Sequence, residues 1–358
     1  MKGVKKLLTI CVTVALLVAL LVPATAFAAE VTGNVTSNNN DPEGLSITLK
    51  THGGDSTSSM TPQTEYDLEI DVTDDNTLAD IEHIDIVIFF DVDAGDDGTP
   101  GGTWDCDEEA IYKWEDGGVG WTMEDGALTP VTDHTWTLED GDCALPGTMT
   151  ATSTSGGNKW ILAFKPGKLA AECDGDPSEW DIKVTVYDLA AASATTTTYS
   201  LSMTAYSSIT TDVASVTFGS GVALGAIAYI DTPGDNNFAS QVLANDAYDI
   251  KVDSAATWTG AGTLTLDPSG TPDAAGEFAL NIDDTDAGSG APTVEQAVTT
   301  SATTITGYDS GTTSRVATAD ATAEATSDQD FVMSLKLYST GIPVGAYSGT
   351  ITLTIVNS

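Results

Sequence analysis

Apolar and polar residues alternate along most of this chain, in short segments separated by glycine, aspartate and proline. In residues 66–72 the alternation places Tyr66, Leu68, Ile70 and Val72 on one face, because successive side chains of a β-strand point to opposite faces. No segment after residue 28 keeps the spacing of an amphipathic helix. In the first half of the chain the pattern predicts strands at residues 45–49, 66–72, 84–90, 110–114, 119–123, 134–138, 160–164 and 180–187.

Local patterns also predict how some of these strands are arranged. Residues 84–90 are almost all apolar, which indicates a central strand covered on both faces. Residues 116–118, Asp-Gly-Gly, separate two strands and predict a hairpin turn. Near the end of the chain, a Gly- and Pro-containing turn separates residues 331–338 from residues 347–356, and this predicts a C-terminal hairpin.

The composition changes near residue 200. Only one of the seven tryptophans, Trp258, lies beyond that point, and residues 190–198 are small and polar, which suits a domain boundary. Strands in the second half are predicted at residues 213–219, 247–252, 262–266 and 278–282. We therefore predict an all-β fold with two antiparallel β-sandwich domains, Ig-like or jelly-roll-like, over residues 29–200 and 201–358.

The first 28 residues predict export from the cell. Lys2, Lys5 and Lys6 form a basic start, residues 7–22 are apolar, and small residues follow up to Ala28. This is the pattern of a secretory signal peptide that is cleaved. We expect a secreted, extracellular or cell-surface protein with no membrane span in the mature chain.

The charge limits the partners. The chain has 53 Asp and Glu against 12 Lys and Arg, a formal net charge of −41. Nucleic acid and anionic lipid need basic residues to displace their counterions, so neither is an expected partner. Such a surface attracts cations, and adaptation to a salty habitat is an alternative reason for the acidity.

Aspartates cluster directly after the predicted central strand. Closely spaced Asp with Gly at the bend supplies the hard oxygen ligands that Ca²⁺ prefers, while the alternative is a solvated acidic turn. The predicted calcium ligands are Asp91, Asp93, Asp96 and Asp97, and Ca²⁺ is the one cofactor that we predict. Weaker acidic turns are formed by Asp71, Asp74, Asp75 and Asn76, and by Asp231, Asp235 and Asn236.

Three cysteines follow the predicted signal peptide, Cys106, Cys143 and Cys173. Export permits disulfides, and we predict a Cys143–Cys173 bond because both flank the strand at residues 159–165. The remaining Cys106 then either stays reduced or links chains. Acidic neighbours disfavour a thiolate at each cysteine, so a nucleophilic role is not expected.

Two tryptophans are open to two interpretations. Trp114 and Trp121 flank the predicted hairpin turn. They either form a platform on which sugars stack or belong to the core, and large aromatic residues of a sandwich favour the core. We predict no enzyme, because the three histidines His52, His83 and His134 lie in unrelated contexts and no catalytic motif is present.

The second half also carries a resemblance to known modules. Residues 216–219, Val-Thr-Phe-Gly, follow a loop and are followed by Gly221. Residues 245–252 come about 25 residues later as an alternating strand, and residues 343–354 form a Gly turn before a Thr-rich strand. Over about residues 210–358 the chain resembles β-sandwich modules of prokaryotic cell-surface and filament proteins, such as WxL-type wall proteins and spore-coat or fimbrial-like subunits. Within residues 210–358 no Trp-x-Leu motif is present, so wall binding is not implied.

Together these features predict a structural subunit of a prokaryotic cell-surface layer, sheath or extracellular filament. Its expected partners are copies of itself or other surface subunits, joined through edge strands or cation bridges. The C-terminal strand and residues 31–35 are the predicted edge strands. The alternative is a secreted carbohydrate-binding or adhesion module with glycans as partners.

Overall fold

The computed structural model describes residues 39–91, 109–118, 120–124, 135–154, 158–174, 178–212, 214–218, 227–230, 237–284, 296–308 and 327–357. Strands dominate these residues, and the one helical element among them is the short 3-10 helix η1 (Leu78–Asp80). Most strand pairs are antiparallel. The predicted all-β fold is confirmed. No helix in the described ranges has the length and hydrophobicity to cross a membrane.

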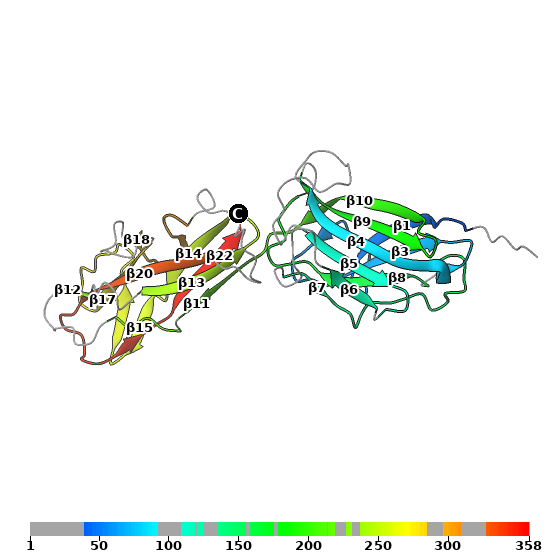
Figure 1. The fold of residues 1–358 in the computed structure, drawn as a ribbon. Helices are drawn as coiled ribbons and strands as arrows, with labels where there is room; N and C mark the ends of the chain where they lie inside the picture. The colour runs from blue at the N-terminus through cyan, green and yellow to red at the C-terminus, as the bar shows by residue number, and fades with distance from the viewer. Residues whose placement is uncertain are drawn as a thin grey trace, which may run out of the picture. The chain divides into compact units, whose positions relative to one another are not determined.

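The first hydrophobic core lies between two sheets (Figure 1). The smaller sheet has the order β1-β3-β8-β7, with β1 (Glu43–Thr51), β3 (Tyr66–Thr73), β8 (Trp160–Lys165) and β7 (Thr137–Leu138). The larger sheet has the order β2-β10-β9-β4-β5-β6, with β2 (Ser59–Met60), β10 (Ser193–Met203), β9 (Glu179–Asp188), β4 (Ile81–Asp91), β5 (Glu109–Glu115) and β6 (Trp121–Glu124).

Alternation along the strands builds this core. Every second residue of β3 from Tyr66 to Val72 is buried, and aromatic rings from the two sheets meet between them. Trp114 of β5 lies edge-on to Trp160 of β8 at 5.4 Å between ring centroids. Burying each large apolar side chain stabilises the fold by about 1.5–3 kcal/mol. β4 lies between β9 and β5, which confirms the predicted central strand.

The second hydrophobic core also has two sheets. The 9-stranded sheet follows the order β11-β13-β20-β17-β16-β15-β21, with β12 beside β20 and β18 beside β17. Its strands are β11 (Ser207–Thr211), β12 (Ile227–Ile230), β13 (Asn237–Ala244), β15 (Thr257–Gly260), β16 (Thr263–Leu266), β17 (Glu277–Asp284), β18 (Gln296–Ala297), β20 (Ser327–Tyr338) and β21 (Tyr347–Ser348). The 3-stranded sheet consists of β19 (Thr303–Thr304), β14 (Tyr248–Ser254) and β22 (Ile351–Asn357).

The predicted C-terminal hairpin is wrong. β20 pairs with β12, β13 and β17 in the 9-stranded sheet, whereas β22 pairs with β14 in the other sheet. After β20 the chain adds β21 to the 9-stranded sheet, and residues 349–350 then carry it to the other sheet. The alternating pattern of β22 determines which face is buried, but it does not determine the partner strand.

Two further segments differ from the sequence-based expectation. Residues 214–218, predicted as part of a strand, have no regular structure. Most of residues 190–198, whose composition suggested a linker, belongs to β10, which pairs with β9 along its length. Leu201 and Met203 at the end of β10 are buried in the first core. The division into two domains stays a prediction.

Candidate binding groove

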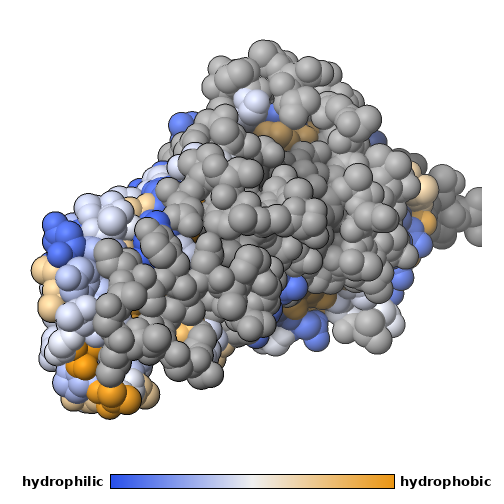
Figure 2. All heavy atoms as spheres, turned by 90° about the vertical axis from the view of Figure 1, so that its left-hand side faces the viewer, coloured by the Kyte–Doolittle hydropathy of each residue, from blue (hydrophilic) through white to orange (hydrophobic). Residues whose placement is uncertain are grey.

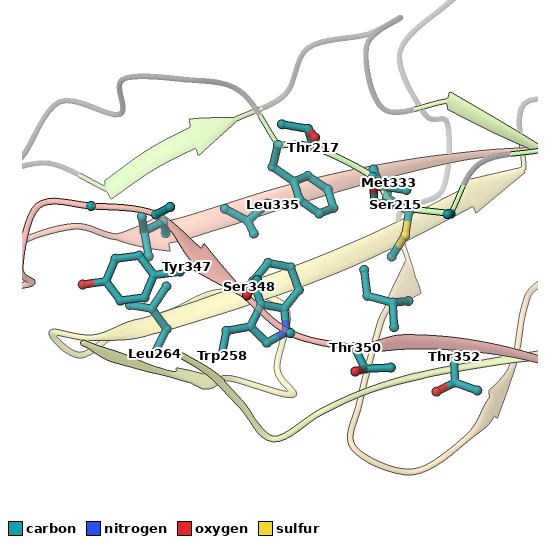
Figure 3. Close-up of a pocket in the computed structure, with 18 of the residues that line it drawn as sticks. Ser215, Thr217, Trp258, Leu264, Met333, Leu335, Tyr347, Ser348, Thr350 and Thr352 are labelled. Carbon is teal, nitrogen blue, oxygen red and sulfur yellow. The ribbon is translucent and has the colours of Figure 1, made fainter. Parts of the chain in front are cut away.

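A groove of about 1300 Å³ opens into the second core (Figure 3). Residues of both sheets line it, among them Ile209 of β11, Leu335 of β20 and Leu353 of β22. Its volume exceeds the roughly 300–1,000 Å³ that is usual for small-molecule pockets. The size therefore suits a segment of polypeptide better than a small metabolite.

The groove lies beside strands that are paired on one side only. Within the described residues, β22 pairs with β14 alone and β11 pairs with β13 alone. On β14, Ile250 and Val252 are fully buried, whereas Ile351 and Leu353 of β22 are only half-buried although they face the same core. The core is thus incompletely covered along β22.

Trp258 of β15 forms part of the groove wall (Figure 3). Its ring centroid lies 4.7 Å from that of Phe278 and 6.1 Å from that of Phe218. Its Nε1 donates a hydrogen bond to Ser254 Oγ at 3.3 Å. A Cβ atom at Gly349 would overlap the indole ring, so only glycine lets the backbone pass this closely.

The described residues that line the groove are uncharged. Apart from the indole N–H of Trp258, their polar side chains are hydroxyl groups, mainly of serine and threonine, and none of them is acidic or basic. In a chain with 53 acidic residues, this is an unusual stretch of surface. Val344, which also lines the groove, is 80% exposed, and Figure 2 shows hydrophobic residues at the surface of the face that it draws. Exposed apolar patches of this kind mark sites of association.

The predicted calcium cluster is only partly described. Asp93, Asp96 and Asp97 lie outside the described residues, so the site stays a prediction. Asp91 ends β4 and is buried, and Glu179 of β9 lies opposite it in the sheet register. Asp181, two residues along β9, is also buried. The sequence analysis missed these two β9 carboxylates because only the strand pairing brings them to Asp91.

The structure does not form the predicted disulfide between Cys143 and Cys173. Cys143 is a free thiol that packs on β8, where Ala163 N donates to its Sγ at 3.3 Å. Cys173 instead lies against β10, with its Sγ donating to Leu201 O at 3.6 Å. The two thiols thus contact different sheets, and burial raises the pKa of Cys143 to about 11. Cys106 lies outside the described residues.

Both tryptophans of the β5–β6 hairpin belong to the core. Trp114 and Trp121 face each other across the hairpin, and each is 3% exposed. The favoured interpretation is confirmed, and these two residues do not form a sugar-stacking platform. The hairpin turn predicted at residues 116–118 is also confirmed.

The aspartates of the predicted acidic turn at residues 71–76 lie in different environments in the structure. Asp71 forms an ion pair with Lys159 at 2.7 Å, and Asp75 is exposed. Asp74 is fully buried and lies near two other aspartates that the sequence analysis did not connect with it. Asp231, Asp235 and Asn236 lie outside the described residues.

One histidine belongs to an exposed acidic cluster. His52 Nδ1 lies 3.0 Å from Asp67 Oδ1 and 3.1 Å from Glu65 Oε1. The hydrogen bond with Asp67 is the main cause that raises the pKa of His52. The two carboxylates therefore favour the protonated form of the imidazole.

Comparison with known proteins adds little. No protein-family model matches the chain, and no curated protein sequence matches it. Among solved structures, the chain is similar to the CsuC–CsuE chaperone-tip adhesion subunit pre-assembly complex from archaic chaperone-usher Csu pili of Acinetobacter baumannii. The TM-score is 0.27 and the identity 11%, over 88% of this chain and 92% of that chain. A likeness at this level carries no argument about function.

Proposed function

We propose that this protein is a secreted structural subunit of a cell-surface layer, sheath or extracellular filament, and that its subunits join by strand addition at the groove. The supporting observation is that the described residues lining the groove are uncharged and that, among the described strands, β22 beside it pairs with β14 alone. A strand with an unpaired edge offers a row of backbone donors and acceptors to an incoming strand. Main-chain hydrogen bonds then give affinity, and alternate side chains that enter the groove give specificity.

The proposed occupant is the segment at residues 31–38 of a second copy. Its sequence, Val-Thr-Gly-Asn-Val-Thr-Ser-Asn, has no charge. In an extended conformation Val31, Gly33 and Val35 share one face, which matches the apolar lining of the groove. Valine and threonine also favour strands.

Charge is the second reason for this choice. Two copies that each carry a net charge of −41 repel each other. Contact is least unfavourable where both surfaces are neutral, and an uncharged segment entering an uncharged groove meets that condition. Strand addition between copies would repeat along a chain of subunits, because each copy has one segment and one groove.

A peptide experiment tests the occupant. The receptor is the chain lacking residues 1–38, which keeps all strands from β1 onward, and the probe is a fluorescent peptide of residues 31–38. We expect saturable binding measured by fluorescence anisotropy. The matched control peptide carries Val31→Asp and Val35→Asp, which keeps the backbone but places charges on the inward face. Equal binding of the two peptides would refute strand addition by this segment.

An assembly experiment tests the groove. Leu353→Glu places a charge on the groove side of β22, whereas Thr354→Glu places the same charge on its exposed side. Sedimentation and negative-stain electron microscopy of residues 29–358 should show oligomers for the original chain and for Thr354→Glu, and monomers for Leu353→Glu. Circular dichroism checks that both variants fold. If the original chain stays monomeric at all concentrations, the proposal fails.

A further inference from the structure

Three aspartates that are distant in sequence meet at the first core. Asp74 follows β3, Asp80 ends η1 and Asp188 ends β9. One carboxylate oxygen from each lies within 4.8 Å of the other two. Oxygens that bind one Ca²⁺ ion at about 2.3–2.6 Å lie at most about 5 Å apart. The spacing of the three carboxylates therefore fits a single shared ion.

The local backbone holds two of these carboxylates in place. Asn76 N donates to Asp74 Oδ1 at 2.7 Å, which forms a tight turn after β3. Ala190 N and Ala192 N donate to Asp188 Oδ1 at 2.9 and 2.8 Å. The bond to Asp74 is to its Oδ1, so the second oxygen of this carboxylate can face a ligand without disturbing the turn.

One carboxylate oxygen of Asp74 is buried without a hydrogen-bond partner. Its side chain has no exposed surface, and its Oδ2 accepts no hydrogen bond. The buried Oδ2 of Asp80 has no hydrogen-bond partner either. A buried carboxylate oxygen without a donor carries a desolvation cost. Such an oxygen, placed among two other acids, points to a missing positive charge.

Electrostatics lead to the same conclusion. Burial raises the pKa of Asp74, and repulsion from Asp80 and Asp188 raises it further, against the hydrogen bond from Asn76. The ion pairs formed among the described residues include neither Asp74 nor Asp80. A bound cation would offset both the burial and the repulsion.

We propose that Asp74, Asp80 and Asp188 bind one Ca²⁺ ion. All three ligands are hard oxygens, and the half-buried position of Asp80 leaves access for the waters that complete six to eight ligands. Mg²⁺ demands a regular octahedron at about 2.0–2.1 Å and keeps more of its water, so it suits a cluster of protein carboxylates less well. Because β3 and β9 belong to opposite sheets, the ion ties the two sheets of the first core together.

Calcium titration of matched variants tests this site. Isothermal titration calorimetry and thermal melting of residues 29–358 are carried out with CaCl₂ or MgCl₂ at constant ionic strength. Asp74→Asn removes a ligand charge but keeps the oxygen that accepts from Asn76. Asp75→Asn removes the same charge from the exposed neighbouring residue, which lies outside the cluster.

We expect a Kd of about 10⁻⁴ M for the original chain and for Asp75→Asn, the range of extracellular calcium modules. In Asp74→Asn the affinity falls at least about tenfold, because fewer ligand charges weaken a calcium site. The calcium-dependent rise in melting temperature should also be lost. Asp80→Asn serves as a second ligand variant if Asp74→Asn fails to fold. Equal calcium responses in Asp74→Asn and Asp75→Asn, or an equal response to Mg²⁺, would overturn the assignment.

Discussion

At the residue scale, Gly349 lets the backbone pass close to Trp258 in the groove wall. Gly349→Ala places a methyl group on the Trp258 indole, which then moves or forces the chain away. We expect a loss of about 1–3 kcal/mol in the free energy of unfolding, the usual cost of overpacking. Chemical denaturation measures it. Gly141→Ala is the control, because a Cβ there meets nothing within 4 Å, and an equal effect at both positions would contradict the expectation.

The environment of Asp74 predicts that the stability of the folded chain depends on pH in the absence of metal. Burial and the neighbouring acids Asp75, Asp80 and Asp188 raise its folded-state pKa, so the folded chain binds this proton more tightly than the unfolded chain. Stability from this residue is therefore present at low pH and is lost as pH rises through the folded-state pKa. In EDTA, the stability of Asp74→Asn relative to the original chain should increase as pH rises from the ordinary aspartate pKa of about 4 through the raised folded-state pKa. A constant difference would contradict this prediction.

At the element scale, two lysines form ion pairs between neighbouring strands. Lys50 of β1 and Lys159, which directly precedes β8, both contact acidic residues of β3. Lys50 Nζ lies 2.8 Å from Glu69 Oε1, and Lys159 Nζ lies 3.1 Å from Glu69 Oε2 and 2.7 Å from Asp71 Oδ2. Burial alone would raise the pKa of Glu69, but the hydrogen bonds from the two lysines lower it overall. The resulting stability is present near neutral pH and is lost as pH falls through the folded-state pKa.

Replacing one of these lysines tests the link between the strands. Lys159→Gln should lower the free energy of unfolding by about 1 kcal/mol, the upper range for partly exposed ion pairs. Urea denaturation at low ionic strength measures this loss. The same measurement at about 1 M NaCl is the control, because salt screens the pair. A loss that salt leaves unchanged would show that packing, and not charge, is responsible.

The elements also show where sequence-based prediction succeeds and where it fails. The strands at residues 66–72 and 84–90 were predicted because their hydrophobic pattern depends only on neighbouring residues. The partner of β22 was not, since alternation does not encode pairing. The groove could not be predicted for the same reason, because it depends on which strands pair. Nor could the cluster of Asp74 with Asp80 and Asp188, because these residues are distant in sequence and come together only in the folded chain.

At the scale of the whole molecule, the net charge of −41 dominates. Self-repulsion destabilises a compact state, and the screening length falls from about 10 Å at 0.1 M salt to about 3 Å at 1 M. The melting temperature should therefore rise as NaCl increases, in the presence of EDTA so that calcium does not contribute. Differential scanning calorimetry measures it. A melting temperature that is flat or falls with salt would show that the acidic residues are already well separated.

The position of Trp258 makes this residue a built-in spectroscopic reporter of the groove. It is the only tryptophan after residue 200, and it lies in the groove wall. With fluorinated tryptophan, its fluorine resonance is the one expected to move when an incoming chain expels water from the groove, while those of the other tryptophans stay in place. The fluorine signal of this one residue would thus report the addition of each subunit.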